Sequence, residues 1–525
     1  MLWRVRSQLS TLCAVANESD SIPEPRDLAE ARQIIATLSQ RLVYAERKTL
    51  LLQHELDVWL RRIFGRRSEK LTADERQLLL EIVEAHAIPG QGAVEADSGE
   101  RLPRESRDRR KARPHGRQTL PADLPRRIEV VDEPEAERTC SRCGQEKVEI
   151  GHEVSEKLEY VPASLHVVQT RRVKRACPAG HGVTVAPSAP QAVEKSLAAE
   201  GLLAHVVVSK YADHLPLHRQ EAILARHGVH LSRQTQCDWV REVARACEPI
   251  VEEIRRQVLA ADYLQTDDTS VVVLGGDEGR FKGRLWAYLD PLARQVVFEA
   301  TATHERAGPE AFLSAFRGHL QADAYKGYDA LYSSGRIVEV ACWAHGRRRF
   351  KESLDTDPRA AEVLLLVQEL YAIEDEAKET SPEARQRLRQ ERSVPVLAKI
   401  DEVRRRLQAD VLPKSPLGDA LRYLDNQWAP LQRFVEDGRL AIDNNRAENQ
   451  LRIVAVGRKN WLFAGSLEGA RWAAVLYSLV QGCRLVGVDP FLYFRDVLRR
   501  LPTHPQKLIG QLTPRAWAET LAASA

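Results

Sequence analysis

The sequence predicts a multidomain α/β protein in which an all-helical insertion interrupts a mixed core. Its 525 residues are too many for one hydrophobic core, and at about 150 residues per domain they suggest several modules. Extended segments at 263–274, 284–289 and 295–300 are followed by alternating helices and strands. A long helical stretch then precedes a polar helix that begins near residue 443. This order of elements is typical of a ribonuclease H-like core.

Charge and cysteine content narrow the class of protein. The chain carries 77 basic and 74 acidic residues, so contacts with nucleic acid would have to come from local basic patches. Eight cysteines are too few for a disulfide scaffold in a chain of this length. No apolar run reaches the roughly 18 residues of a membrane span, and the N-terminus lacks a signal-peptide core. We therefore expect a cytoplasmic protein without a membrane partner.

The N-terminal part of the chain divides by composition into three segments. Residues 1–28 form an irregular tail. Heptad spacing of apolar residues predicts a coiled coil within residues 29–88, although a helix packed on its own domain fits the same spacing. Residues 89–130 are rich in Gly, Pro and Arg and predict a disordered basic linker. That linker is either a solvated tether or a DNA-binding arm, because a charge run alone does not discriminate between them.

A zinc-ribbon-like module is expected at residues 131–190. Cys140 and Cys143 have the spacing of one half of a tetrahedral zinc site, and Cys177 with His181 can supply the other half. The second pair has three intervening residues where a zinc ribbon usually has two. Unmetallated thiols in a small β module are the alternative.

Residues 191–250 predict a helix-turn-helix. A helix at 217–226 is followed by Gly228 and by a second helix that Ser232 caps. Side chains early in the second helix would face the major groove of DNA. The same pattern also occurs in proteins that never bind DNA. The residues expected to contact DNA here are Arg233, Gln234 and Gln236.

The core is expected at residues 251–465, with the helical insertion at about 352–435. Its fourth strand should end at Asp323, after a helix at 309–320. In a ribonuclease H-like arrangement, an acid on the first strand lies beside an acid at the end of the fourth, and a later helix supplies a third acid. Residues 466–525 predict a C-terminal helical region. The three candidate acids are Asp267, Asp323 and Glu448.

Three carboxylates of this kind suit two Mg²⁺ ions, or Mn²⁺ in their place, because hard cations prefer oxygen ligands. Two such ions promote in-line displacement at a phosphodiester, so the acids indicate phosphoryl transfer on DNA. The alternative is that each acid is a surface or capping residue. Asp268, next to Asp267, leaves the identity of the ligand open, and Asp443 is expected to cap the helix that bears Glu448.

Two basic pairs are candidates for contact with the DNA backbone. Arg347 and Arg348 follow His345, and composition does not decide between a phosphate contact and a solvated helix. Arg458 and Lys459 are close to Glu448 in sequence and follow Gly457, which favours a grip on phosphate.

Taken together, these stretches resemble the transposase of the insertion-sequence-sixty-six family, a group of bacterial DDE transposases. The resemblance runs from about residue 64 to residue 500. It rests on the following ordered motifs: Phe64-Gly65-x-x-Ser68-Glu69-Lys70-Leu71, the cysteine module, Ser209-Lys210-Tyr211, Asp267-Asp268-Thr269, Asp323 with Tyr325 and Tyr328, Cys342-x-Ala344-His345, Pro413-Lys414-Ser415-Pro416, Asp443-Asn444-Asn445-Arg446-Ala447-Glu448 and Arg458-Lys459-Asn460-Trp461-Leu462-Phe463.

The resemblance implies an enzyme that cuts and joins the terminal inverted repeats of an insertion sequence, with Asp267, Asp323 and Glu448 as its catalytic triad. It further implies double-stranded DNA, both element ends and target, as partner, and accessory proteins encoded by the same element. We also expect a homo-oligomer, because pairing two ends requires dimerisation. The sequence departs from the family at Gly180, where a fourth Cys is usual. A catalytically silent end-binding repressor and a nuclease that does not join DNA are the alternatives.

Overall fold

The structure is a computed structural model that describes residues 165–176, 183–185, 187–276 and 278–524. The predicted tail, coiled coil and basic linker lie outside these residues. The described chain divides into two compact units. Ala261–Asp267 and Pro309–Glu448 belong to the first, and the remaining described residues belong to the second. The division falls within one strand and within one helix, so both elements contribute to both units.

A five-stranded sheet has the strand order β5-β4-β3-β6-β7. β4 and β5 are antiparallel, whereas β6 is parallel to both β3 and β7. The predicted first strand, 263–274, has the bounds of β3, and its Val, Thr and Tyr residues favour an extended chain. The strands are β3 (Tyr263–Leu274), β4 (Arg280–Asp290), β5 (Gln295–Thr301), β6 (Gly318–Gln321) and β7 (Ile337–Val340).

The predicted helix at 309–320 is shorter in the structure. α7 (Ala307–Phe312) and a 3-10 turn end before β6 begins at Gly318. Gly318 has a φ of +133°, and a Cβ at this position would lie 2.3 Å from the carbonyl oxygen of Asp262. Only glycine therefore permits β6 to pair with β3 here. α8 (Asp329–Ser333) follows and leads to β7.

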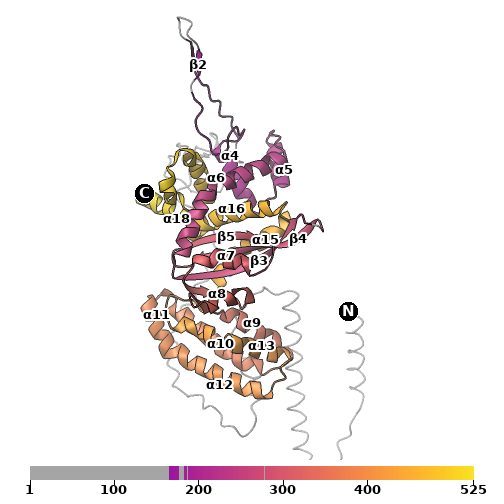
Figure 1. Cartoon of the computed structure of the whole chain (residues 1–525), viewed down its shortest axis with the longest axis vertical. Coiled ribbons are helices and arrows are strands. Elements are labelled where there is room, and N and C mark those ends of the chain that lie inside the picture. The colour runs from indigo at the N-terminus through magenta and orange to yellow at the C-terminus, as the bar shows by residue number, and fades with distance from the viewer. Residues whose placement is uncertain (1–164, 177–182, 186, 277, 525) are drawn as a thin grey trace, which may run out of the picture. The chain divides into compact units, whose positions relative to one another are not determined.

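In the first unit, residues 352–435 are helical apart from short turns, as the sequence predicted. Figure 1 shows α10, α12 and α13 lying alongside one another. Their apolar faces form one buried core with the residues that follow β7, including Trp343. The helices are α9 (Trp343–Ser353), α10 (Ala360–Glu376), α11 (Pro382–Leu388), α12 (Val394–Asp410), α13 (Pro416–Asn426) and α14 (Trp428–Gln432).

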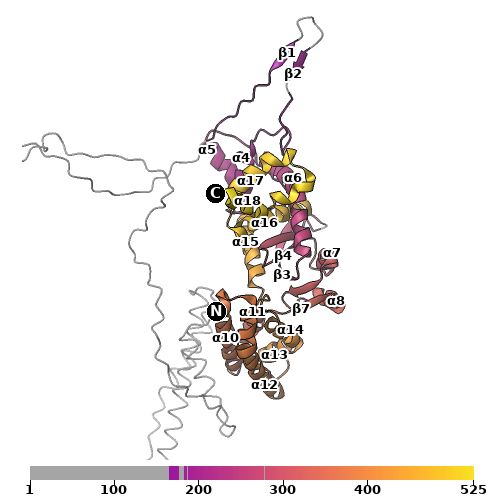
Figure 2. The ribbon, with the colours of Figure 1, turned by 90° about the vertical axis from the view of Figure 1, so that its left-hand side faces the viewer.

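In the second unit, helices pack on β5. The backbone N–H of Phe298 donates to Ser478 Oγ on α16 over 2.8 Å, and Arg255 on α6 pairs with Glu299. α6 thus continues past the predicted domain boundary at residue 250. Figure 2 shows α4, α6, α17 and α18 in this unit. Its helices are α4 (Glu200–Tyr211), α5 (Leu217–Arg226), α6 (Arg233–Leu259), α16 (Leu467–Val486), α17 (Pro490–Arg500) and α18 (Pro514–Ser524), and α15 (Asn445–Trp461) precedes α16.

Candidate active site

Asp267 lies on β3, and Asp323 lies two residues beyond the end of β6, the parallel neighbour of β3. In the pairing of β3 with β6, Gln265 stands opposite Gln321. Continued by two residues, the same register would set Asp267 opposite Asp323, which lies just beyond the end of β6. Paired strands are about 4.8 Å apart, so such a register would bring the two acids close together. The closeness of these two acids stays a prediction from the register of the residues before them.

The beginning of α15 is hydrogen-bonded to β3. The side chain of Asn444 donates to the carbonyl oxygen of Thr266 over 3.1 Å, and Gln265 donates to the carbonyl oxygen of Asp443 over 3.0 Å. Thr266 immediately precedes Asp267, and Asn444 accepts the backbone N–H of Glu448. Glu448 consequently lies in the first turn of a helix whose start is bound next to Asp267.

A cluster of buried polar side chains also joins β3, β6 and the segment before α15. Tyr263 donates to Gln321 Oε1, and Gln265 Nε2 donates to the same oxygen over 2.8 Å. Gln321 in turn donates to the carbonyl oxygen of Ala441 over 2.7 Å. Burial raises the pKa of the Tyr263 phenol to about 12, so it remains a neutral donor. These uncharged bonds fix the register of β3, β6 and the segment before α15.

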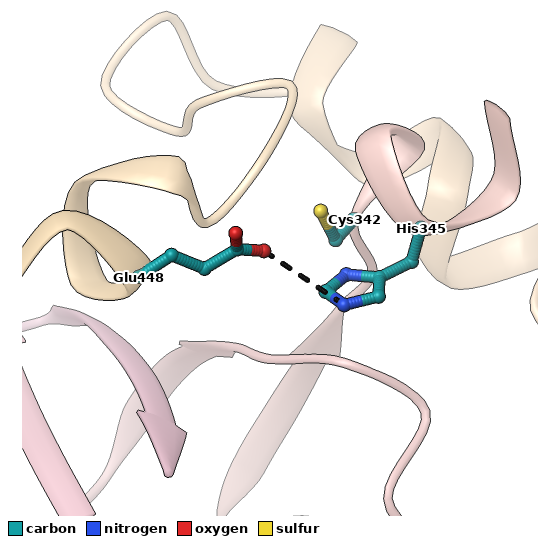
Figure 3. A group of neighbouring side chains, drawn as sticks. All are labelled: Cys342, His345 and Glu448. Carbon is teal, nitrogen blue, oxygen red and sulfur yellow. Dashed lines mark ion pairs between the residues drawn. The ribbon is translucent and has the colours of Figure 1, made fainter. Parts of the chain in front are cut away.

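Cys342, His345 and Glu448 form a compact cluster in the first unit. Their potential ligand atoms all lie within 4.8 Å of one another. Figure 3 shows the three side chains pointing toward one another from the start of α9 and from α15, with His345 Nε2 3.8 Å from Glu448 Oε1. Both His345 Nδ1 and Glu448 Oε1 are buried without a hydrogen-bond partner. Buried polar atoms without a partner are rare in folded proteins, so these two atoms are candidates to bind an ion or a water molecule.

Burial raises the pKa of the Cys342 thiol to about 12, although the backbone N–H groups of Asn444 and His345 donate to its sulfur. The thiol is therefore protonated at neutral pH in the absence of a metal. In the sequence, Cys342 and His345 belong to the Cys342-x-Ala344-His345 motif, and no metal site is predicted there. The Cys-x2-His spacing was the available signal for a cluster, but its third member is distant in sequence.

Asp443 caps the helix that bears Glu448, as expected from the sequence. Its carboxylate accepts the backbone N–H of Asn445, the first residue of α15, over 3.2 Å. It also accepts hydrogen bonds from Tyr371 and from the Asn445 side chain. Burial raises the pKa of this carboxyl above its ordinary value. Asp443 therefore holds the start of α15 in place.

Asp268 has two charged or polar partners of its own. Its carboxylate accepts a hydrogen bond from Arg284 Nη1 at 2.8 Å and lies 3.1 Å from His304 Nε2. Neighbouring residues on a strand point to opposite faces, so Asp267 and Asp268 face different surroundings. This arrangement favours Asp267 over Asp268 as the candidate ligand.

The helix-turn-helix elements form as predicted, but their side chains differ in exposure. α5 ends at a turn in which Gly228 has a φ of +75°, and Ser232 accepts the backbone N–H of Thr235 at the start of α6. Arg233 and Gln234 are exposed. The predicted DNA contact of Gln236 is wrong. This side chain is fully buried and donates to the carbonyl oxygen of Leu231, so it does not face DNA.

The predicted phosphate contacts also divide by exposure. Arg348 and Lys459 are exposed, whereas Arg347 is half-buried with its guanidinium over the Tyr371 ring. Arg458 donates from Nη1 to Thr269 Oγ1 at 2.9 Å and to the carbonyl oxygen of Ser270 at 2.6 Å. The guanidinium of Arg458 therefore binds β3 within the protein.

The predicted zinc ligands Cys140, Cys143, Cys177 and His181 lie outside the described residues. On either side of Cys177 and His181 in the sequence, β1 (Lys174–Ala176) and β2 (Val183–Val185) pair antiparallel with each other. A two-stranded ribbon therefore flanks the second predicted ligand pair. Among the described helices, none is both long and apolar enough to cross a membrane.

Four family models match the chain. A model described as "Transposase IS66 family" matches residues 195–472 and so includes most of the predicted helix-turn-helix region. "Zinc-finger binding domain of transposase IS66" matches residues 137–179. "Transposase C of IS166 homeodomain" matches residues 51–129, across the predicted coiled coil and linker, and "IS66 C-terminal element" matches residues 478–515. The zinc-finger match covers three of the predicted zinc ligands and ends before His181.

Curated relatives from Sinorhizobium fredii are similar over almost the whole chain. Uncharacterized protein y4jD is 33% identical over 484 residues, which cover 88% of this chain and 93% of the relative. Uncharacterized protein y4hP is 30% identical over 499 residues, covering 90% of both chains. Uncharacterized protein y4qI is 33% identical over 501 residues, again covering 90% of both. With a transposase model matching more than half of its length, this chain belongs to the IS66 transposase family.

Proposed function

We propose that this protein is a metal-dependent DNA transposase that binds the terminal inverted repeats of its element, cleaves there, and joins the freed ends to target DNA. The observation that carries the proposal is the way in which β3, β6 and the start of α15 are joined in the first unit. Gln265 on β3 pairs with Gln321 on β6, two residues before Asp267 and Asp323. Asn444, four residues before Glu448, donates to the carbonyl oxygen of Thr266.

The strand arrangement supports a ribonuclease H-like core. The three strands β3, β4 and β5 follow one another in the chain and lie side by side, while β6 and β7 extend the sheet beyond β3 in parallel. An acid within a central strand, a second acid just past the end of its parallel neighbour and a third acid on a later helix are the expected constellation. The long helical insertion lies between the second acid and the third.

The donor set fits Mg²⁺, or Mn²⁺ in its place. Asp267, Asp323 and Glu448 offer only carboxylate oxygens, the ligands that hard cations prefer. Glu448 Oε1 is buried without a hydrogen-bond partner, and a bound cation would satisfy it. When bound at such a site, a pair of these ions activates the attacking oxygen and stabilises the leaving oxygen.

The protein's own residues position the DNA and the acids. Asp443 and Asn444 hold the first turn of α15, so that the Glu448 carboxylate is fixed before DNA binds. Arg348 and Lys459 are exposed, and their positive charges would be expected to neutralise backbone phosphates. Positioning and charge neutralisation dominate phosphoryl transfer, so these supports matter as much as the ligands.

The expected partners follow from this reaction. Joining two ends requires two copies of the chain, so we infer a homo-oligomer on double-stranded DNA, aided by accessory proteins of the same element. The zinc-finger domain is expected to bind structural zinc through Cys140, Cys143, Cys177 and His181. When it is bound to chromosomal DNA, the protein would be associated with the bacterial nucleoid.

The test is strand transfer in magnesium with labelled DNA that carries the parent element's own ends. We expect joined product with the native protein and none with Glu448→Gln, while both bind the ends. Glu436→Gln is the matched control, because Glu436 is an exposed acid of the same unit. If the native protein binds the ends but neither cuts nor joins, even with the element's accessory proteins, an end-binding repressor replaces the transposase proposal.

A further inference from the structure

We propose that Cys342, His345 and Glu448 form a binding site for a zinc-like divalent ion, separate from the zinc-finger domain. The three ligand atoms lie within 4.8 Å of one another, and all three residues belong to the first unit. Ligands around a tetrahedral zinc ion are roughly 3.5 Å apart, so small side-chain rotations would close the cluster on an ion.

The cluster is preformed by the backbone. Cys342 is the residue before α9 and His345 lies in its first turn, so their three-residue spacing places both on one side of the helix. Glu448 approaches from the first turn of α15 (Figure 3). The Cys342 sulfur accepts the backbone N–H of Asn444, which links the two helix starts. A metal would therefore find its ligands already assembled.

The cluster contains two polar atoms that a bound ion could satisfy. His345 Nδ1 and Glu448 Oε1 are both buried without a hydrogen-bond partner. The side chains of His345 and Glu448 are only 22% and 27% exposed, so water satisfies them incompletely. Leaving a buried polar atom unpaired costs about 1–3 kcal/mol. Coordination of a cation by His345 Nδ1 and Glu448 Oε1 would satisfy both atoms.

The ligand types select the class of metal. A thiolate, an imidazole and a carboxylate suit zinc and related transition metals, whereas Mg²⁺ takes oxygen ligands. Three protein ligands also leave one coordination position open. The Cys342 thiol would release its proton to solvent when the metal–sulfur bond forms.

This site has a consequence for catalysis that rests on the proposed function. Glu448 is the only residue that the zinc-like site shares with the candidate magnesium site. Because one carboxylate cannot complete both sites in the same geometry, a zinc-like ion would withdraw Glu448 from magnesium. Micromolar zinc should then inhibit strand transfer in competition with magnesium.

The test uses Co²⁺ as a spectroscopic probe of the full-length protein with its zinc-finger domain loaded with zinc. Thiolate-to-cobalt absorption reports a Co–S bond directly. We expect native protein to bind one equivalent more than Cys342→Ser, with the additional absorption absent from the variant. His345→Gln should weaken this binding by more than the roughly 10- to 100-fold typical of residues that only support a ligand.

Cys247→Ser is the matched control. Cys247 is also fully buried, and burial likewise raises the pKa of its thiol to about 12, but it is not part of the cluster. It should retain the cobalt absorption of the native protein. If Cys342→Ser and Cys247→Ser both match native protein in stoichiometry and spectrum, the site does not exist.

The two proposals fail separately. Asp267→Asn should abolish strand transfer and keep the cobalt absorption, because Asp267 is outside the cluster. Cobalt binding with no strand transfer by native protein would refute the transposase proposal and leave the metal site standing. Strand transfer without the additional cobalt absorption would refute the metal site alone.

Discussion

Asn444 donates to the carbonyl oxygen of Thr266 across 178 positions of sequence, and this bond joins the segments that carry two of the candidate acids. Asn444 is fully buried, so the bond is shielded from water. It precedes Glu448 by one helical turn, whereas Thr266 precedes Asp267 directly. The helical insertion can therefore be long without changing the position of Glu448, because a hydrogen bond to β3 holds the chain immediately before this residue.

Replacing Asn444 should remove the hydrogen bond that holds the start of α15 to β3. Asn444→Ala leaves the Thr266 carbonyl oxygen without this donor, and we expect a loss of about 1–3 kcal/mol in the free energy of unfolding. Strand transfer should fall with it, because Glu448 is less well positioned. Denaturant unfolding and the joining assay measure the two effects. Asn449→Ala, at an exposed position of the same helix, is the control, and equal losses in both variants would contradict this role for Asn444.

Asp267 and Asp268 should separate activity from stability. Asp267→Asn removes a candidate ligand, so strand transfer should disappear while end binding persists. Asp268→Asn weakens the contacts with Arg284 and His304 and should lower the free energy of unfolding by about 1–3 kcal/mol. Joining assays and thermal unfolding on both variants check this. Loss of joining in Asp268→Asn, with joining intact in Asp267→Asn, would reverse the assignment.

Local patterns predicted most of the secondary structure in the core. β3 has the bounds expected from its run of Thr, Val and Tyr, because such side chains favour a pleated strand. The helix expected to reach residue 320 ends early, since Gly318 must approach the Asp262 backbone to begin β6. That close approach is a tertiary requirement, and helix propensity does not contain it.

The site was predicted less completely than the fold. Resemblance and residue type selected Asp267, Asp323 and Glu448, whereas Cys342 entered only as part of a family motif and not as a metal ligand. Its cluster with Glu448 depends on how α15 meets the end of β7, which no local spacing encodes. Gln236 was expected at a DNA surface from its place in the helix, yet tertiary packing of α6 buries it.

Arg233 should contribute to DNA affinity through charge. It is exposed at the first position of α6. Arg233→Ala should weaken binding to the element ends and reduce the slope of log affinity against log salt by about one. Fluorescence anisotropy across a salt series measures both quantities. Arg245→Ala, exposed farther along α6, should keep the native slope, and identical slopes in all three proteins would exclude Arg233 from the interface.

Zinc in the zinc-finger domain should depend on His181 as well as on the cysteines. Cys140→Ser and His181→Ala should each reduce the zinc bound by this domain, because each removes one of four expected ligands. Metal analysis after dialysis against a mild chelator provides the measurement. His230→Ala serves as the control histidine outside this domain. Unchanged zinc in His181→Ala would mean that another residue completes the site.

Arg389 should be the main electrostatic support of the helical insertion. It is 1% exposed and makes two hydrogen bonds of 2.7 Å to the Glu374 carboxylate. It also donates to the carbonyl oxygens of Phe434 and Asp437. Arg389→Met would leave the largely buried Glu374 charge uncompensated and both carbonyls without this donor. We expect a loss of about 3–5 kcal/mol in the free energy of unfolding.

Arg392 provides a comparison from the same turn of the chain. It pairs with Glu376, but these side chains are 46% and 45% exposed. Solvent screens such a pair, so Arg392→Met should change the free energy of unfolding by only about 0–1 kcal/mol. Urea unfolding of both variants measures the difference. Similar losses for Arg389→Met and Arg392→Met would show that burial of the ion pair does not govern the stability of the insertion.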